Sequence, residues 1–228
     1  MIQLVKLTTY LSIFIQLVTG FFGFAGLTYK LPPPHNILTG ALTIEMIVQA
    51  IEFIFYIGLI AYFNLRNMAT IRYYDWFITT PTMLFTTALV YYYLYKVEQN
   101  KEKDISLRQF VKEHQNSLAI ILLANFMMLV FGYLGETQVI NSYTAFVFGF
   151  VFLAIAFYTL YQDFAKYLKE QRYLFIILTV VWSMYGVVFL FPAAYKNIVF
   201  NFLDIIAKNF FGLFLFVKIR QIHKTLAR

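Results

Sequence analysis

The chain has 228 residues, of which 61% are hydrophobic, 21% aromatic and only 13% charged. A soluble domain carries about 25% charged residues, so this composition excludes an ordinary water-soluble globule and indicates a membrane protein. The net charge of +7 does not indicate a nucleic-acid partner, because the basic residues cluster between apolar segments, and the absence of cysteine excludes disulfide and thiol chemistry.

Seven apolar segments follow one another, each near the ~20 residues that a helix needs to cross a bilayer. They cover approximately residues 4–26, 37–62, 69–95, 117–134, 139–161, 171–191 and 198–218. The first has Lys6 but no small-x-small cleavage site, and six more segments follow, so we interpret it as a retained helix. The sequence predicts an all-α membrane protein, with residues 1–228 forming a single domain of seven transmembrane helices.

The basic residues predict the orientation of this bundle. Most of them fall in three connections and the tail, all on one side: Lys30, Lys96, Lys101, Lys103, Arg108, Lys112, Lys166, Lys169, Arg172, Lys218, Arg220, Lys224 and Arg228. The other side has only Lys6, Arg66 and Lys196, apart from the intramembrane Arg72. The positive-inside rule then predicts a cytoplasmic C-terminus and an N-terminus outside.

In the second segment, Glu45 and Glu52 lie two helical turns apart and therefore share one face. That segment contains no cation that could pair with them, and two unpaired glutamates cannot face lipid. We expect them to face water or the bundle interior, with Ser12 and Asn209 at comparable depths. The alternative is that both are protonated and hydrogen-bonded in a structural role.

The third segment carries Arg72, Asp75 and Thr79 at i, i+3, i+7 spacing, which places them on one face. An arginine and an aspartate this close would hold each other ionised, so one interpretation is an ion pair that only fixes helix packing. Asp204 and Lys208 weaken that interpretation, because two carboxylates can balance two cations with no net buried charge.

The longest connection runs roughly from Lys96 to Asn116. Residues 104–113 place Ile105, Leu107, Phe110 and Val111 broadly on one side. Asp104 is a plausible N-cap, so we expect a short amphipathic helix on the cytoplasmic membrane surface. A solvated charged loop is the alternative.

Polar residues are few in the later segments. Asn125 most simply hydrogen-bonds a neighbouring helix. Trp182, Tyr185 and Phe189 share a face of the sixth segment, either as core packing or, opposite Trp76, as a slot for a flat conjugated ligand. His35, His114 and His223 fall in connections or the tail, and no metal-ligand spacing is visible.

Lys208 lies in the middle of the last segment, where a lysine is costly and is usually functional. Asp204 lies one turn before it on the same face. A desolvated lysine is also the usual nucleophile for a Schiff base with an aldehyde.

Through these stretches the sequence resembles the microbial rhodopsins, and the resemblance covers essentially the whole chain. The most diagnostic are Arg-Tyr-x-Asp-Trp-x-x-Thr-Thr-Pro at residues 72–81 and Asp-x-x-x-Lys at residues 204–208. Trp-Ser-x-Tyr at residues 182–185 supports them, as do Met128 and Gly132.

The resemblance implies that Lys208 binds all-trans retinal as a protonated Schiff base, with Asp75 and Asp204 as counterions and Arg72 on the extracellular side. The retinal pocket that it implies consists of Trp76, Thr79, Thr80, Met128, Gly132, Trp182, Tyr185 and Phe189.

Departures from the proton-pumping relatives bear on the function. In those relatives, three positions of the third helix form a functional motif. Here the three positions are Asp75, Thr79 and Thr86, so Thr86 replaces the cytoplasmic proton-donor carboxylate. The sixth segment ends in Phe-Pro-Ala-Ala at 191–194, without the acidic pair that releases protons, and Gly186 replaces a kinking proline.

Ser12, Glu45, Glu52, Asp204 and Asn209 together resemble the group 1 viral rhodopsins of giant algal viruses, which act as light-gated cation channels. We therefore expect a channel for monovalent cations or protons in the host cell membrane, and no enzyme. The expected ion path and gate consist of Ser12, Glu45, Glu52, Arg72 and Asn209. The alternatives are an outward proton pump and a sensory photoreceptor, and assembly into a homo-oligomer stays open.

Overall fold

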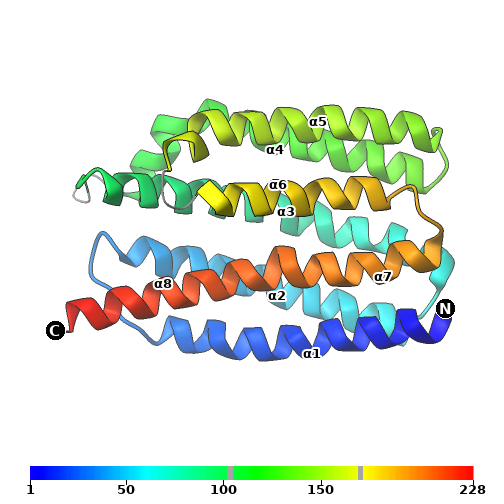
Figure 1. The fold of residues 1–228 in the computed structure, drawn as a ribbon, viewed down its shortest axis with the longest axis horizontal. Coiled ribbons are helices and arrows are strands. Elements are labelled where there is room, and N and C mark those ends of the chain that lie inside the picture. Colours follow the sequence, from blue (N-terminus) through cyan, green and yellow to red (C-terminus); the bar gives the residue numbers. More distant parts are fainter. Residues whose placement is uncertain (102–104, 169–171, 228) are drawn as a thin grey trace.

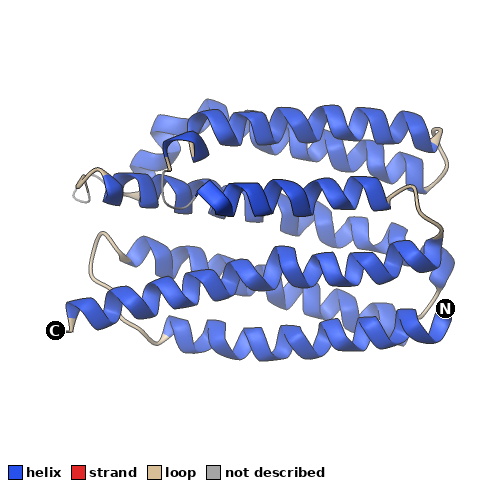
Figure 2. Ribbon diagram, viewed as in Figure 1, coloured by secondary structure: helices blue, strands red, loops and turns tan. Residues whose placement is uncertain are grey.

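The computed structural model describes residues 1–101, 105–168 and 172–227, which form a bundle of long helices lying side by side (Figure 1). The helices are α1 (Ile2–Leu27), α2 (Asn36–Ala61), α3 (Leu65–Glu98), α4 (Leu107–Glu136), α5 (Ser142–Asp163), α6 (Arg172–Val188), α7 (Ala193–Asp204) and α8 (Phe210–Leu226). A π-helical turn, η3 (Ile205–Asn209), joins α7 to α8, and a 3-10 turn, η2 (Ala165–Tyr167), follows α5. Figure 2 shows only helices and loops in the described part of the chain.

The seven expected spans are confirmed, because α7, η3 and α8 form one continuous span, Ala193–Leu226. Five spans are long and apolar enough to cross a membrane by composition alone, namely α1, α2, α4, α5 and Ala193–Leu226. In its described part α6 is shorter, at 17 residues. Buried arginine, aspartate, threonine and tyrosine residues lower the hydropathy of α3, so its polarity belongs to the bundle interior.

A helix begins in the connection between the third and fourth spans, as expected, but it is the first part of α4 and not a separate short helix. Phe110 is buried, whereas Leu107 and Val111 are exposed, so the expected common apolar face is only partly buried. The N-cap of α4 is Ser106, whose side chain accepts a hydrogen bond from the Gln109 amide at 3.1 Å. The helix bends at His114 and continues into the fourth span. Phe110 is fully buried against the rings of Phe85 and Tyr92, which anchors this segment to the bundle. The predicted N-cap Asp104 lies outside the described residues.

Helix α1 is polar inside and apolar outside. Its buried side chains form a polar stripe, Thr8, Thr9, Ser12, Gln16 and Thr19. Phe14 and Phe21 on the opposite face are 63% and 72% exposed. This inverted pattern suits a helix that turns its apolar face to lipid, and α1 packs its stripe side against α2, α7 and α8.

Candidate functional site

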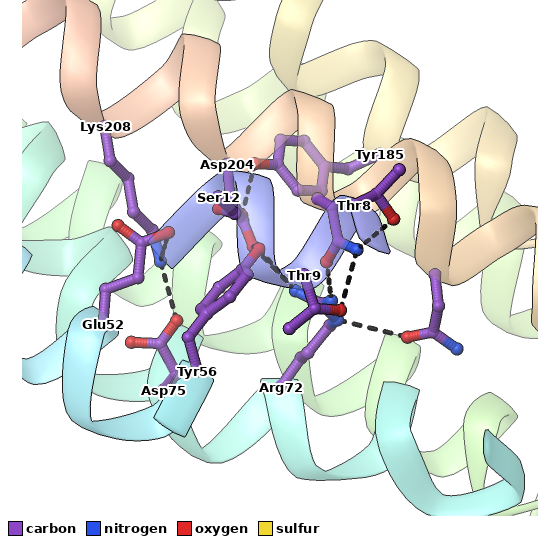
Figure 3. A network of polar contacts seen from close by, with 12 residues as sticks. Thr8, Thr9, Ser12, Glu52, Tyr56, Arg72, Asp75, Tyr185, Asp204 and Lys208 are labelled. Carbon is purple, nitrogen blue, oxygen red and sulfur yellow. Dashed lines mark hydrogen bonds and ion pairs between the residues drawn. The ribbon is translucent and has the colours of Figure 1, made fainter. Parts of the chain in front are cut away.

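Lys208 lies in the π-helical turn η3, and its side chain is buried in the centre of the bundle. Its Nζ donates to Asp75 Oδ2 at 2.7 Å and lies 3.6 Å from Glu52 Oε1 (Figure 3). π-helical turns are rare and frequently occur at functional sites. A buried ammonium here is therefore faced by two carboxyl groups from different helices.

Asp204 is fully buried one turn earlier and is bound from three sides. Its Oδ2 accepts from Arg72 Nη1 at 2.8 Å and from the Tyr56 hydroxyl at 2.7 Å, while Oδ1 accepts from the Tyr185 hydroxyl at 2.6 Å (Figure 3). This carboxylate is thus saturated by its own donors. No ion pair joins it to Lys208 within the described residues.

The pairing of charges therefore corrects one prediction. The spacing within the third helix suggested that Arg72 and Asp75 hold each other, but Arg72 pairs with Asp204 and Asp75 pairs with Lys208. The reason is that α3 and α7 run in the same direction (Figure 1). Each helix climbs about one turn between its two charged residues, so each cation meets the carboxylate level with it on the other helix.

Arg72 is held by residues that the sequence analysis missed. Its Nε donates to Asn197 Oδ1 at 3.2 Å, its Nη1 also reaches Tyr56, and its Nη2 donates to Asn201 Oδ1. Asn201 in turn donates to the hydroxyls of Thr8 at 2.8 Å and Thr9 at 3.1 Å on the polar stripe of α1. A signal existed, because residues 197, 201, 204 and 208 recur at helical spacing on one face.

An apolar cavity adjoins Lys208 between α3, α4, α5, α6 and α7. Most of the predicted pocket lines it: Trp76, Thr80, Met128, Gly132, Trp182, Tyr185 and Phe189. Thr79 does not line it, and its hydroxyl donates to the Asp75 carbonyl of its own helix at 3.0 Å. The sequence analysis missed further lining residues from α5, among them Phe146, Gly149 and Phe150.

The lining residues fit a flat conjugated molecule with one reactive end. Trp76 and Tyr185 meet edge to face with ring centroids 5.4 Å apart, and Trp182 adds a second indole. The side chains of Thr80 and Asn125 hydrogen-bond each other, so the cavity wall beside Thr80 carries no charge. Among the described residues, the cavity therefore offers aromatic and apolar walls together with one amine, Lys208, and one carboxylate, Asp204, an arrangement that suits an apolar aldehyde.

Of the five residues predicted for the ion path and gate, Arg72 is described above. The other four, Ser12, Glu45, Glu52 and Asn209, are all buried, but no hydrogen bond joins any two of them in the described chain. Ser12 accepts from Gln16 Nε2 at 3.3 Å. The two glutamates also separate, because Glu52 faces Lys208 whereas Glu45 bonds the Thr86 hydroxyl. The residues thus occupy separate positions along the bundle.

Asn209 joins a polar network that the sequence analysis did not identify. Its Oδ1 accepts from the Thr19 hydroxyl at 2.5 Å and from Gln49 Nε2 at 3.0 Å. Gln49 also donates to the Gln16 carbonyl at 2.7 Å. Asn209 Nδ2, Gln16 Oε1 and both oxygens of Glu52 remain without a hydrogen-bond partner. Buried polar atoms of this kind are usually satisfied by water or ions.

Comparisons with known proteins agree with this geometry. The sequence profile of the family described as bacteriorhodopsin-like protein matches residues 4–222. The crystal structure of viral rhodopsin OLPVRII is 26% identical, with a TM-score of 0.82, covering 96% of this chain and 99% of that chain.

Two further solved structures share the fold. A blue light-absorbing proteorhodopsin from Med12 is 20% identical, with a TM-score of 0.70 and coverage of 95% and 96%. The bromide-bound halorhodopsin from Halobacterium salinarum is 14% identical, with a TM-score of 0.69 and coverage of 97% and 94%. No curated protein sequence matches the chain.

Proposed function

The chain belongs to the bacteriorhodopsin-like family of microbial rhodopsins, and from that premise we propose that it is a light-gated cation channel with retinal bound at Lys208. The proposal includes the all-trans isomer, an N-terminus outside the host cell membrane and a C-terminus in the cytoplasm. Residues 1–228 would act as one domain.

The observation that carries the proposal is the polar stripe of α1 and what faces it. Thr8 and Thr9 meet Asn201, and Thr19 meets Gln49 and Asn209, so polar side chains from α1, α2 and the last span adjoin over several turns. Polar residues are rare inside membranes and mark ion pathways. The unpartnered atoms of Gln16, Glu52 and Asn209 support a path that takes up water and cations.

When bound, retinal supplies absorption of visible light and an isomerisation that changes its shape. Lys208 would hold it, and Asp75, at 2.7 Å from the lysine nitrogen, would keep the positive charge there in place. Trp76, Trp182 and Tyr185 would orient the chromophore in the cavity and exclude water from it. In the dark, the hydrogen bonds from Arg72 to Asp204 and Asn201 would close the ion path on the side of the bundle where the N-terminus lies.

The neighbours of Lys208 provide a physical route from light to gating. Three buried carboxyl groups, Glu52, Asp75 and Asp204, face only two cations, Arg72 and Lys208. Displacement of the lysine nitrogen removes positive charge from Glu52 and Asp75, which then attract a cation. Asn209 follows Lys208 in the chain, so the same displacement strains its bonds to Thr19 and Gln49.

Voltage-clamp recording of the protein in a cell membrane under illumination tests the proposal. A channel's photocurrent reverses sign as the membrane voltage is varied, and the reversal voltage shifts when cations are exchanged on one side. A photocurrent of constant sign at every voltage contradicts the channel.

Replacing either second-helix glutamate tests the proposed path. We expect Glu52→Ala and Glu45→Ala to alter the size or the decay rate of the photocurrent by about fivefold or more, while the visible band remains. The reason is that a carboxyl near an ion path changes the local energy of a cation by about 1 kcal/mol or more. Glu113→Ala, at an exposed position of α4, is the matched control. Unaltered currents in both variants exclude the path.

One observation favours a second candidate, an outward proton pump. The carboxyl of Glu45 bonds the hydroxyl of Thr86, the position that a proton-donor carboxylate occupies in pumping relatives. The Thr86 hydroxyl also lies 3.2 Å and 3.0 Å from the carbonyl oxygens of Thr82 and Met83. The hydroxyl has only one proton to donate. If Glu45 is protonated and donates to Thr86, that proton is free for one of the two carbonyls. Helix α2 thus supplies the carboxyl that α3 lacks.

Moving the carboxyl group from α2 to α3 tests whether Glu45 returns a proton to the Lys208 site. In a pump, Glu45→Gln slows recovery of the dark visible band after a flash by about a hundredfold, the usual contribution of a positioned acid. The double variant Glu45→Thr with Thr86→Asp restores fast recovery, because the carboxyl returns to the same place from the other helix. Recovery that is equally fast in Glu45→Gln and the unaltered protein rules out this role.

A further inference from the structure

The walls that α4, α5 and α6 give to the apolar cavity are less covered than the wall that α3 gives. On α4, Met128 and Gly132 are half-buried, but a Cβ atom added to Gly132 would meet the Tyr73 hydroxyl at 2.6 Å, so no open space adjoins that position. Lys208 borders the cavity from the last span, and α6 lies between α5 and α7 (Figure 1). Lining residues on α3, such as Trp76, are buried, whereas Gly149 and Phe150 of α5 and Gly186 of α6 are half-buried. The part of the cavity across from Lys208 therefore approaches the lipid-facing surface.

Two glycines leave this wall without side chains. A Cβ atom added to Gly149 would meet no atom within 4 Å, so open space adjoins that position. A Cβ added to Gly186 would meet the Phe150 ring at 2.5 and 2.8 Å, so the phenyl ring fills the place of the missing α6 side chain. The Phe150 ring packs on the ring of Phe146, 4.6 Å between centroids. A phenyl ring makes no hydrogen bonds, so it can rotate away without breaking any.

An apolar molecule that entered from the end of the bundle where the N-terminus lies would meet a far higher barrier than one that crossed this wall. There Tyr56, Tyr185 and Arg72 all bond Asp204, and an apolar molecule passing between them would leave buried polar groups unpaired. A lateral path through Gly149 and Phe150 crosses only apolar contacts. Retinal is a lipid-soluble aldehyde, so the bilayer itself is its reservoir.

We propose that retinal enters this protein sideways from the membrane, between α5 and α6, through a window formed by Gly149, Phe150 and Gly186. Phe150 acts as its flap and Gly149 keeps it open. The molecule passes along the cavity until its aldehyde meets Lys208. The inference rests on the proposed attachment of retinal to Lys208, but it is independent of whether the protein conducts ions or pumps protons.

The test measures uptake of all-trans retinal in the dark by retinal-free protein in lipid vesicles. The readouts are the rate at which the visible band appears and its final amplitude. We expect Gly149→Leu to slow uptake about tenfold, which corresponds to a barrier higher by about 1.4 kcal/mol. Phe150→Ala should accelerate uptake, because it removes the flap. Gly212→Leu in α8 is the matched control, since an added Cβ there also meets no atom within 4 Å and the residue does not line the cavity.

The outcomes separate the window from the binding site. Slow uptake in Gly149→Leu alone, with fast uptake in Phe150→Ala, supports the window. Equal rates in Gly149→Leu, Gly212→Leu and the unaltered protein overturn it, as does a Phe150→Ala protein that is no faster. If the unaltered protein forms no visible band, the attachment at Lys208 fails instead.

Discussion

Replacing Lys208 with alanine is expected to abolish the visible absorption band completely. The residue supplies the only amine that lines the apolar cavity in the described part of the chain. Without that amine no covalent link to an aldehyde can form, and free retinal lacks the cationic charge that Asp75 stabilises at 2.7 Å from the nitrogen. The measurement is the absorption spectrum of the purified protein after addition of all-trans retinal.

Lys196→Ala is the matched control for this experiment. Lys196 is also a buried lysine paired with a carboxylate, Glu136 Oε2 at 2.7 Å, but it does not line the cavity. Its replacement should leave the band in place. A visible band that survives in Lys208→Ala would overturn the assignment of the chromophore site, whatever the control shows.

Replacing Asp204 with asparagine is expected to reduce the free energy of unfolding by about 3–5 kcal/mol, the usual effect of removing one partner of a buried ion pair. Arg72 is only 2% exposed, and its contacts to Asn197, Asn201 and Tyr56 are to neutral groups. The substitution therefore leaves a buried guanidinium without a countercharge. Denaturant titration in detergent, followed by helical circular dichroism, measures the change.

The double variant Arg72→Gln with Asp204→Asn separates charge from hydrogen bonding. Both charges are then absent, so part of the lost stability should return relative to Asp204→Asn alone. Glu136→Gln breaks the more exposed pair with Lys196, whose side chains are 10% and 11% exposed, and should cost less. A double variant less stable than the single one would mean that the hydrogen bonds of Asp204 to Tyr56 and Tyr185, and not its charge, dominate.

The fold was largely predictable because the membrane imposes a simple rule. A span needs about 20 apolar residues, and all backbone polar groups must be satisfied within the segment, which only a helix allows for a single chain segment. The seven spans follow from this rule alone. The ends of the helices could not be predicted in this way, because α3 extends to Glu98 and the last span extends to Leu226, beyond the apolar segments that mark the bilayer.

The buried position of Lys208 was also predictable, since a lysine in an apolar segment one turn after an aspartate is costly and therefore conspicuous. Its partner was not. Spacing within one helix fixes only which residues share a face, whereas the partner depends on the level and direction of the neighbouring helix. Spacing suggested that Asp75 pairs with Arg72 and Asp204 with Lys208. In the structure Asp75 pairs with Lys208 and Asp204 with Arg72.

The amide and hydroxyl groups were the hardest to recognise. Thr19, Gln49 and Asn201 carry no charge, so none of them is conspicuous in an apolar sequence. Their function is visible only once three helices bring them within 2.5–3.1 Å of their partners. Glu45 was conspicuous, but its meeting with Thr86 depended on the packing of α2 against α3.

The sequence by itself determined a seven-helix membrane bundle, a buried lysine and an aromatic pocket, because composition, span length and the cost of buried charge act along one chain. Tertiary structure alone decided that Arg72 pairs with Asp204, that Asp75 and Glu52 face Lys208, and that the Glu45 carboxyl meets the Thr86 hydroxyl. Hydrogen bonds and ion pairs act over about 3 Å, so the choice of partner depends on how helices distant in the sequence are set side by side.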